Sequence, residues 1–281
     1  MSAYVPPHRR KVAAAAGSAG AAASSRFAAI VVVNLRRRPD RLERFAASAS
    51  RALGAPWSRF DAVDGASAAA IGDADFCDAW DATRNAAHDR GVAPGWRTAT
   101  AGERGCALSH VALWRGAAAR PDRDWTLVCE DDCRFDGAWR AELARRWPTV
   151  PDDAELVYLG FSDRGDRTAV ADGVFAPAYG FATHCYAIRA PAARRFLGAL
   201  PVAGPVDVWL ADGGWHGAPT YGVVVPGRGW RGTGAWLATQ DSKPGDADVR
   251  QSSRDPPAAA PAPARDDVGA AADALGGLSV V

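Results

Sequence analysis

The acidic triplet Glu130, Asp131 and Asp132 is the feature of the sequence best suited to chemistry. It directly follows the apolar run WTLVC at 125–129, which has the composition of a buried strand. Ligands of open α/β sheets bind at the carboxyl ends of strands, and three hard oxygen donors suit Mg²⁺ or Mn²⁺. The pattern therefore predicts a divalent-metal site that could neutralise a diphosphate leaving group. A solvated acidic turn is the alternative, because such a run also occurs by chance.

A second polar segment, NLRRRPDR at 34–41, follows the apolar run at 27–35. Backbone N–H groups and arginines at the end of a strand can hold the base, ribose and phosphates of a nucleotide. Asn34, Arg38 and Arg41 are the candidate contacts. An exposed basic turn that begins a helix is the alternative.

Two further residues could take part in catalysis. His110 falls on the apolar face of a predicted helix, where the pattern suits a hydrogen-bonded core histidine as well as a functional one. Asp207 lies among apolar residues in GPVDVWL; burial can raise the pKa of such a carboxyl and suit it to general-base work, although it could equally cap a helix. His216 is a weaker metal-ligand candidate. Four tryptophans could stack on a sugar or fill the core: Trp209, Trp215, Trp230 and Trp236.

The cysteines give no sign of a zinc ribbon or a disulfide framework, because no CxxC pair occurs and their number is odd. Cys129 and Cys133 would lie on one face if they shared a strand, but two ligands do not make a metal site. Free, mostly buried thiols are expected, which favours a reducing compartment. The five cysteines are Cys77, Cys106, Cys129, Cys133 and Cys185.

Charge and composition exclude several classes of protein. The chain has 281 residues, with 33 basic and 32 acidic residues and a net charge of +1, so a general nucleic-acid or membrane-surface binder is not indicated. No apolar run is long enough for a transmembrane helix, and no clear secretory signal is present. The sequence thus favours the cytoplasm, with an organelle or the ER or Golgi lumen as alternatives.

Strand and helix patterns alternate between residues 27 and 250, which we predict to be one α/β domain with an open, mostly parallel sheet. Residues 1–26, basic and alanine-rich, and 251–281, rich in proline and alanine, are predicted to be disordered tails; an organelle transit peptide is the alternative for the first. The span 66–101 is predicted to be an irregular flap or acceptor loop. Strands are predicted at 27–35, 57–63, 125–129, 155–159 and 181–188, and helices at 103–120, 138–147 and 191–200, with one more capped by Asp40.

Several segments together resemble glycosyltransferase family 25, the group of lipooligosaccharide and procollagen galactosyltransferases. The resemblance implies a GT-A-type, Rossmann-like fold, inversion at the anomeric carbon, and a UDP-sugar donor, often UDP-galactose, with a glycan or a protein hydroxyl as acceptor. The stronger matches are VVVNLRRRPDRLERF at 31–45, AVDG at 62–65, GERGCALSHVALW at 102–114 and LVCEDDCRF at 127–135. Weaker ones are ELVYLG at 155–160, HCYAIRAPAARRFL at 184–197, PVDVWL at 205–210 and ATQDSKPGDADVR at 238–250.

The resemblance also implies roles for single residues. The 34–41 loop, Asp64 with Gly65, and Asp131 would contact the nucleotide sugar. Glu130 and Asp132 would hold Mn²⁺, or Mg²⁺ in its place. Asp207 is the candidate base, and His110 would orient the donor or the acceptor.

Two other functions remain open at this point. A nucleotidyltransferase uses a similar sheet and metal site, but it usually has a glycine-rich loop after its first strand, where this chain is rich in arginine. An inactive transferase-like domain that only binds a partner is the other alternative. The sequence gives no oligomeric state.

Overall fold

The computed structural model describes residues 26–241, apart from 90, 136, 164–166, 212–215 and 226–234, together with 259–260. The predicted tails fall outside the described residues except at Arg26 and at 259–260, so the tails and the domain boundaries stay predictions. Within the described part of the chain, no helix combines the length and the hydropathy needed to cross a membrane.

The fold begins with the predicted β-α-β unit. β1 (Ala29–Asn34) pairs in parallel with β2 (Ser58–Asp61) on one side and with β6 (Trp125–Glu130) on the other. Its β-branched residues suit a strand that is covered on both faces. The connecting helix α1 (Pro39–Ala52) begins at a proline, whose missing N–H costs nothing there. Asp40 lies inside the first turn and caps nothing, so its predicted capping role is wrong.

The central sheet continues through strands of mixed direction, in the order β2-β1-β6-β11-β8-β13-β10-β9, with β14 beside β13. Only β11, β10 and β14 run against the others, so six of the nine strands described in this sheet share one direction. This arrangement confirms the predicted α/β class. The further strands are β8 (Leu156–Asp163), β9 (Arg167–Ala171), β10 (Val174–Pro177), β11 (Gly180–Arg189), β13 (Thr220–Val225) and β14 (Ala235–Trp236).

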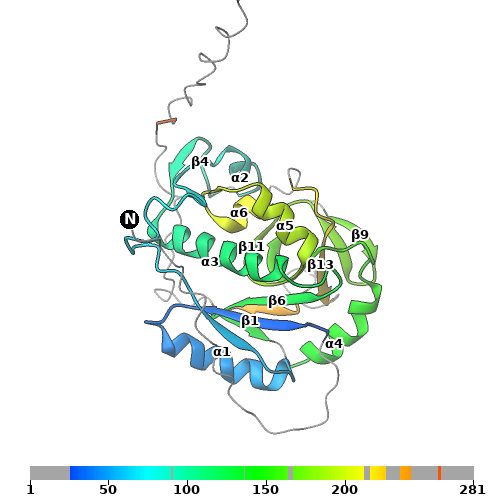
Figure 1. Ribbon diagram of the computed structural model, residues 1–281. Coiled ribbons are helices and arrows are strands. Elements are labelled where there is room, and N and C mark those ends of the chain that lie inside the picture. The colour runs from blue at the N-terminus through cyan, green and yellow to red at the C-terminus, as the bar shows by residue number, and fades with distance from the viewer. Residues whose placement is uncertain are drawn as a thin grey trace, which may run out of the picture.

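Helices cover the sheet on both faces (Figure 1). On one face α1 and α4 (Trp139–Arg146), followed by a short 3-10 turn at Trp147–Thr149, pack on an apolar cluster that contains Phe45 and Leu143. On the other face α3 (Ala101–Ala118), α5 (Ala190–Gly198) and α6 (Val206–Ala211) enclose a second cluster around Trp114. The start of α3 is fixed by a capping box between Thr100 and Glu103.

The span 66–101, predicted to be irregular, contains regular structure. It holds β3 (Phe76–Cys77), β4 (Ala79–Asp81), α2 (Thr83–His88) and β5 (Trp96–Thr98), and β3 pairs with β12 (Val202–Ala203). A small apolar cluster around Trp80 stabilises it. The expectation of an irregular segment is therefore wrong, while its role as an acceptor loop stays a prediction.

Candidate functional site

The two polar segments that the sequence singled out meet where β1 and β6 end side by side. Val33 is paired with Glu130, so Asn34 and Asp131 follow at the same edge of the sheet. Asn34 is buried, and its Nδ2 donates hydrogen bonds to Asp131 Oδ2 at 2.7 Å and to the Arg38 carbonyl at 2.9 Å. The amide thus ties the start of the 34–41 segment to the acidic triplet. Asn34, a predicted nucleotide contact, is buried and positions the Asp131 carboxylate through this hydrogen bond.

Arg41, from the first turns of α1, holds the two aspartates of the triplet. Its Nη2 lies 2.6 Å from Asp131 Oδ1 and 2.9 Å from Asp132 Oδ2, and its side chain is only 10% exposed. Two negative charges therefore share one guanidinium, and the carboxylate of Glu130 stands next to them in the chain. The site carries more negative charge than Arg41 can balance.

Burial and the neighbouring negative charges raise the pKa values of the two aspartates. Burial raises the pKa of Asp131 to about 6, against the lowering effect of Arg41. Burial, and then the charge of Glu130, raise the pKa of Asp132 to about 7. Gln240 of β15 (Ala238–Gln240) donates to Asp132 Oδ2 at 3.0 Å, but Asp132 Oδ1 is buried without a hydrogen-bond partner. A divalent cation fits here, since it would supply both the missing charge and the partner for this oxygen.

Glu130 turns towards a different set of neighbours. Its Oε1 accepts a hydrogen bond from the Thr183 hydroxyl at 2.6 Å and lies 3.4 Å from His110 Nε2. Although burial acts to raise the pKa of Glu130, His110 and Thr183 lower it to about 2. The ligand atoms of Glu130, His110 and Cys106 all lie within 4.8 Å of one another. Among the described residues, the carboxylates of Glu130, Asp131 and Asp132 do not form such a group.

A cavity of about 190 Å³ opens beside these groups. It lies between the end of β1, the turn at 62–66 and the first three turns of α3. Arg38, Asp132 and Asp207 do not line it; Arg38 forms an ion pair with Asp40 at 2.9 Å. The predicted site residues that line the cavity are Arg41, Asp64, Gly65, His110, Glu130 and Asp131.

Gly65 has a structural reason to be glycine that the sequence did not reveal. A Cβ at Gly65 would collide with the carbonyl oxygen of Ala101, and a Cβ at Gly105 would lie 2.6 Å from the carbonyl oxygen of Val63. The turn at 62–65 and α3 therefore touch backbone to backbone. Asp64 projects from this turn and pairs with Arg37 at 2.9 Å, both side chains being half exposed.

His110 is both a core residue and a cavity residue. It is fully buried, and its Nδ1 lies 2.8 Å from the Tyr186 hydroxyl, which also accepts a hydrogen bond from Trp114 Nε1 at 3.1 Å. This network fixes the ring so that Nε2 faces Glu130 and the cavity. Neither Tyr186 nor Thr183 was foreseen, because both lie on β11, far along the chain from the triplet.

Asp207 lies in the first turn of α6, outside the cavity lining. It accepts backbone hydrogen bonds from Val208 at 2.9 Å and from Ala182 at 3.3 Å. Burial raises its pKa to about 6, and the charge of Glu130 contributes to the rise. Since Ala182 is held by Asp207 and Thr183 by Glu130, the two carboxylates flank the same stretch of β11.

Of the weaker candidates from the sequence, His216 and Trp209 lie within the described residues and have structural roles. His216 is buried; its Nδ1 accepts from the Ala218 N–H at 3.0 Å, and its Nε2 lies 3.4 Å from the Leu210 carbonyl oxygen. Trp209 stacks on Trp114 with ring centroids 5.7 Å apart, which is a packing role. Trp215, Trp230 and the side chain of Trp236 lie outside the described residues.

Comparison with known proteins supports the family resemblance. The profile described as glycosyltransferase family 25 (LPS biosynthesis protein) matches residues 27–159, which include the 34–41 segment, the cavity turn and the acidic triplet. Human inactive glycosyltransferase 25 family member 3 is 33% identical over 195 residues, 63% of this chain and 30% of the relative. Mouse procollagen galactosyltransferase 2 is 33% identical over 124 residues, 41% of this chain and 20% of the relative.

A glycosyltransferase 25 family member of Drosophila pseudoobscura pseudoobscura is 28% identical over 194 residues, 63% of this chain and 28% of the relative. The chain thus spans less than a third of the length of these relatives. The profile match and the relatives agree with the site at the ends of β1 and β6. Residues 27–159 therefore match glycosyltransferase family 25, and this match confirms the resemblance that the sequence motifs indicated.

Proposed function

We propose that this chain transfers a hexose, with galactose as the first candidate, from a UDP-sugar to a hydroxyl group of a glycan or a protein, with inversion at the anomeric carbon. One observation carries the proposal. Glu130 and Asp131 of the acidic triplet, Arg41 and the turn that carries Asp64 line one cavity at the carboxyl ends of β1 and β6, and Arg41 also holds Asp132. Such an edge is where nucleotides bind to open α/β sheets.

The donor's diphosphate needs positive charge as the glycosidic bond breaks. Arg37 lines the cavity, is half exposed and would supply part of this charge, whereas Arg41 is already shared by Asp131 and Asp132. A bound Mn²⁺ or Mg²⁺ would neutralise the rest. Asp132, whose Oδ1 is buried without a hydrogen-bond partner, would hold the ion, while Asn34 keeps Asp131 in place. Glu130 would join Asp132 as a ligand by turning away from His110 and Thr183.

An inverting displacement needs a base for the acceptor hydroxyl, and Asp207 is the candidate. With a pKa near 6 its carboxyl is mostly ionised at neutral pH and still accepts a proton readily. Its tie to Ala182, next to Thr183, places it along the same stretch of β11 as Glu130. The acceptor would then approach from the side of α6 and β11.

Titration with UDP, with and without Mn²⁺, tests the donor and metal assignments. We expect binding that strengthens at least about tenfold with Mn²⁺, because one charge contact with the diphosphate is worth that much. A screen of UDP-hexoses for metal-dependent hydrolysis without acceptor then identifies the sugar. UDP binding that ignores Mn²⁺ would contradict the metal assignment.

A second candidate is a transferase-like module that binds a nucleotide or partner without turnover. The name of the human relative, an inactive family member, favours it. The same experiments separate the two functions, since an inactive module can bind UDP but hydrolyses no UDP-sugar with any divalent metal.

A further inference from the structure

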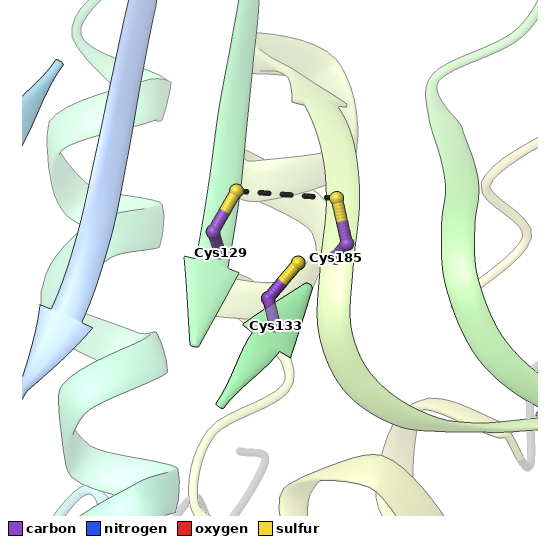
Figure 2. A group of neighbouring side chains, drawn as sticks. All are labelled: Cys129, Cys133 and Cys185. Carbon is purple, nitrogen blue, oxygen red and sulfur yellow. Dashed lines mark hydrogen bonds between the residues drawn. The ribbon is translucent and has the colours of Figure 1, made fainter. Parts of the chain in front are cut away.

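Three cysteines from distant parts of the chain converge beneath the acidic triplet. Cys129 lies on β6, Cys133 on β7 (Cys133–Phe135) and Cys185 on β11. Figure 2 shows their sulfur atoms pointing towards one another. Cys129 and Cys185 face each other across the antiparallel pair β6–β11, with their sulfurs 3.9 Å apart, and all three sulfurs lie within 4.8 Å of one another. Cys129 and Cys133 thus lie on different strands.

The surroundings of this cysteine cluster are dry. Each of the three residues has no exposed surface, and all belong to the apolar cluster beneath α1, together with Leu159 and Ala238. None of them forms a disulfide. An apolar shell of this kind keeps water away from a metal and its ligands.

The spacing of the sulfurs suits a thiophilic cation. With Zn–S bonds of about 2.3 Å, trigonal or tetrahedral coordination sets the sulfurs about 3.8–4.0 Å apart. The 3.9 Å between Cys129 and Cys185 already has this value, and Cys133 lies within 4.8 Å of both. Soft thiolates select Zn²⁺ over Mg²⁺ and Mn²⁺. We propose that Cys129, Cys133 and Cys185 form a structural Zn²⁺ site, separate from the sugar-transfer site.

The coordination number of structural zinc points to His184 as a fourth ligand. Binding of Zn²⁺ to three thiols releases three protons and leaves a complex of net charge −1, and structural zinc sites are usually four-coordinate. His184 precedes Cys185, is buried, and has an Nδ1 without a hydrogen-bond partner. Its Nε2 lies 3.4 Å from the carbonyl oxygen of Ala238, a member of the same apolar cluster.

A site this deep must take up its ion as the chain folds, because the ligands come together only in the native state. Zinc would therefore stabilise the native state and resist chelators until the protein unfolds. The site is independent of sugar transfer, so its presence or absence does not depend on the proposed function.

Metal analysis of the full chain, produced in zinc-supplemented medium and washed with a chelator, tests the site. We expect one zinc per chain. The substitution Cys129→Val should lose it while preserving an apolar strand residue, whereas two variants outside the cluster, Cys77→Ser and Cys106→Ser, should keep it. Loss in Cys106→Ser together with retention in Cys129→Val would place the ion at Cys106, His110 and Glu130 and overturn the proposal.

Two measurements on the unsubstituted chain decide the question even if Cys129→Val does not fold. Refolding with Cd²⁺ alone should produce a thiolate-to-metal charge-transfer band in the ultraviolet, absent after refolding with Mg²⁺. Thiol titration of the denatured, chelator-treated protein should find all five cysteines free. Five free thiols with neither zinc nor a cadmium band, or two thiols missing through a disulfide, would each refute the zinc site.

Discussion

Residues 129–133 supply two regions of opposite chemistry. Glu130 and Asp131 offer hard oxygen atoms that line a cavity, with Asp132 next to them in the chain, while Cys129 and Cys133 offer soft sulfur atoms in a buried apolar core. The change takes place within a single residue step, because successive side chains of a strand point to opposite faces of a sheet. The end of one strand can therefore place hard oxygen ligands at a cavity on one face of the sheet and soft sulfur ligands in the core on the other face.

The largest effect should come from Asp132→Asn, which removes one carboxylate from the acidic triplet and leaves the three cysteines unchanged. Removing a metal-ligand charge should lower metal-dependent turnover by at least about 100-fold, while the protein stays folded because a buried excess charge is removed. Turnover and circular dichroism measure the two effects. Asp61→Asn is the matched control, since Asp61 is exposed and pairs with Arg36 away from the cavity. Full activity in Asp132→Asn would refute its metal role, and loss of zinc would show that the two regions are coupled.

Asp207→Asn should act on the rate of transfer more than on donor binding. A general base acts in the transition state, so we expect kcat to fall by about 100-fold with little change in donor affinity. Steady-state kinetics with varied UDP-sugar and acceptor separates the two parameters. Equal losses in rate and affinity would instead assign Asp207 to holding Ala182 in place.

The pH dependence of stability should distinguish the oxygen region from the sulfur region. The folded-state pKa values of Asp131 and Asp132, about 6 and about 7, lie above their ordinary value of 3.8. The fold therefore favours the protonated carboxyls, and their stabilising contribution is complete below about pH 4 and is lost as the pH rises through 6 and 7. We expect this term to lower the free energy of unfolding by roughly 1–3 kcal/mol.

Urea denaturation of metal-free protein between pH 4 and pH 8 measures this loss. The dependence should be flatter in Asp132→Asn, and Mn²⁺ should restore stability at pH 8. A decline of equal slope in the variant would show that other groups cause it.

The smallest effect should come from Thr183→Val, which removes the hydroxyl that donates to Glu130. Without that hydrogen bond the pKa of Glu130 should rise, and turnover should fall by about three- to tenfold, the worth of one hydrogen bond to a charged group. A pH–rate profile should show the acid limb moving to higher pH. An unchanged profile would mean that His110 alone keeps Glu130 ionised.

The sequence predicted the strands that carry the site, because β-branched runs such as 30–33 have few alternatives to a buried strand, but it did not predict their order in the sheet. It missed the structure of 66–101, since elements of two to six residues show no measurable periodicity. The division of the triplet was also missed: Glu130 turns to His110 while Asp132 turns to Arg41. Thr183, Tyr186 and Gln240 come from strands far along the chain, and only the pairing of β11 with β6 and of β15 with β7 brings them to the site.

The contact between Gly65 and Gly105 also sets how the cavity can change. The backbone of the turn at 62–65 rests there directly on the backbone of α3. No side chain lies between these two walls of the cavity, so their separation does not depend on a side chain. Substitutions of Asp64, His110 or Arg37 can thus change the groups that line the cavity without changing the distance between the turn at 62–65 and α3. Variants with altered ligand binding are best sought at those positions, whereas Gly65→Ala or Gly105→Ala would force the turn at 62–65 and α3 apart.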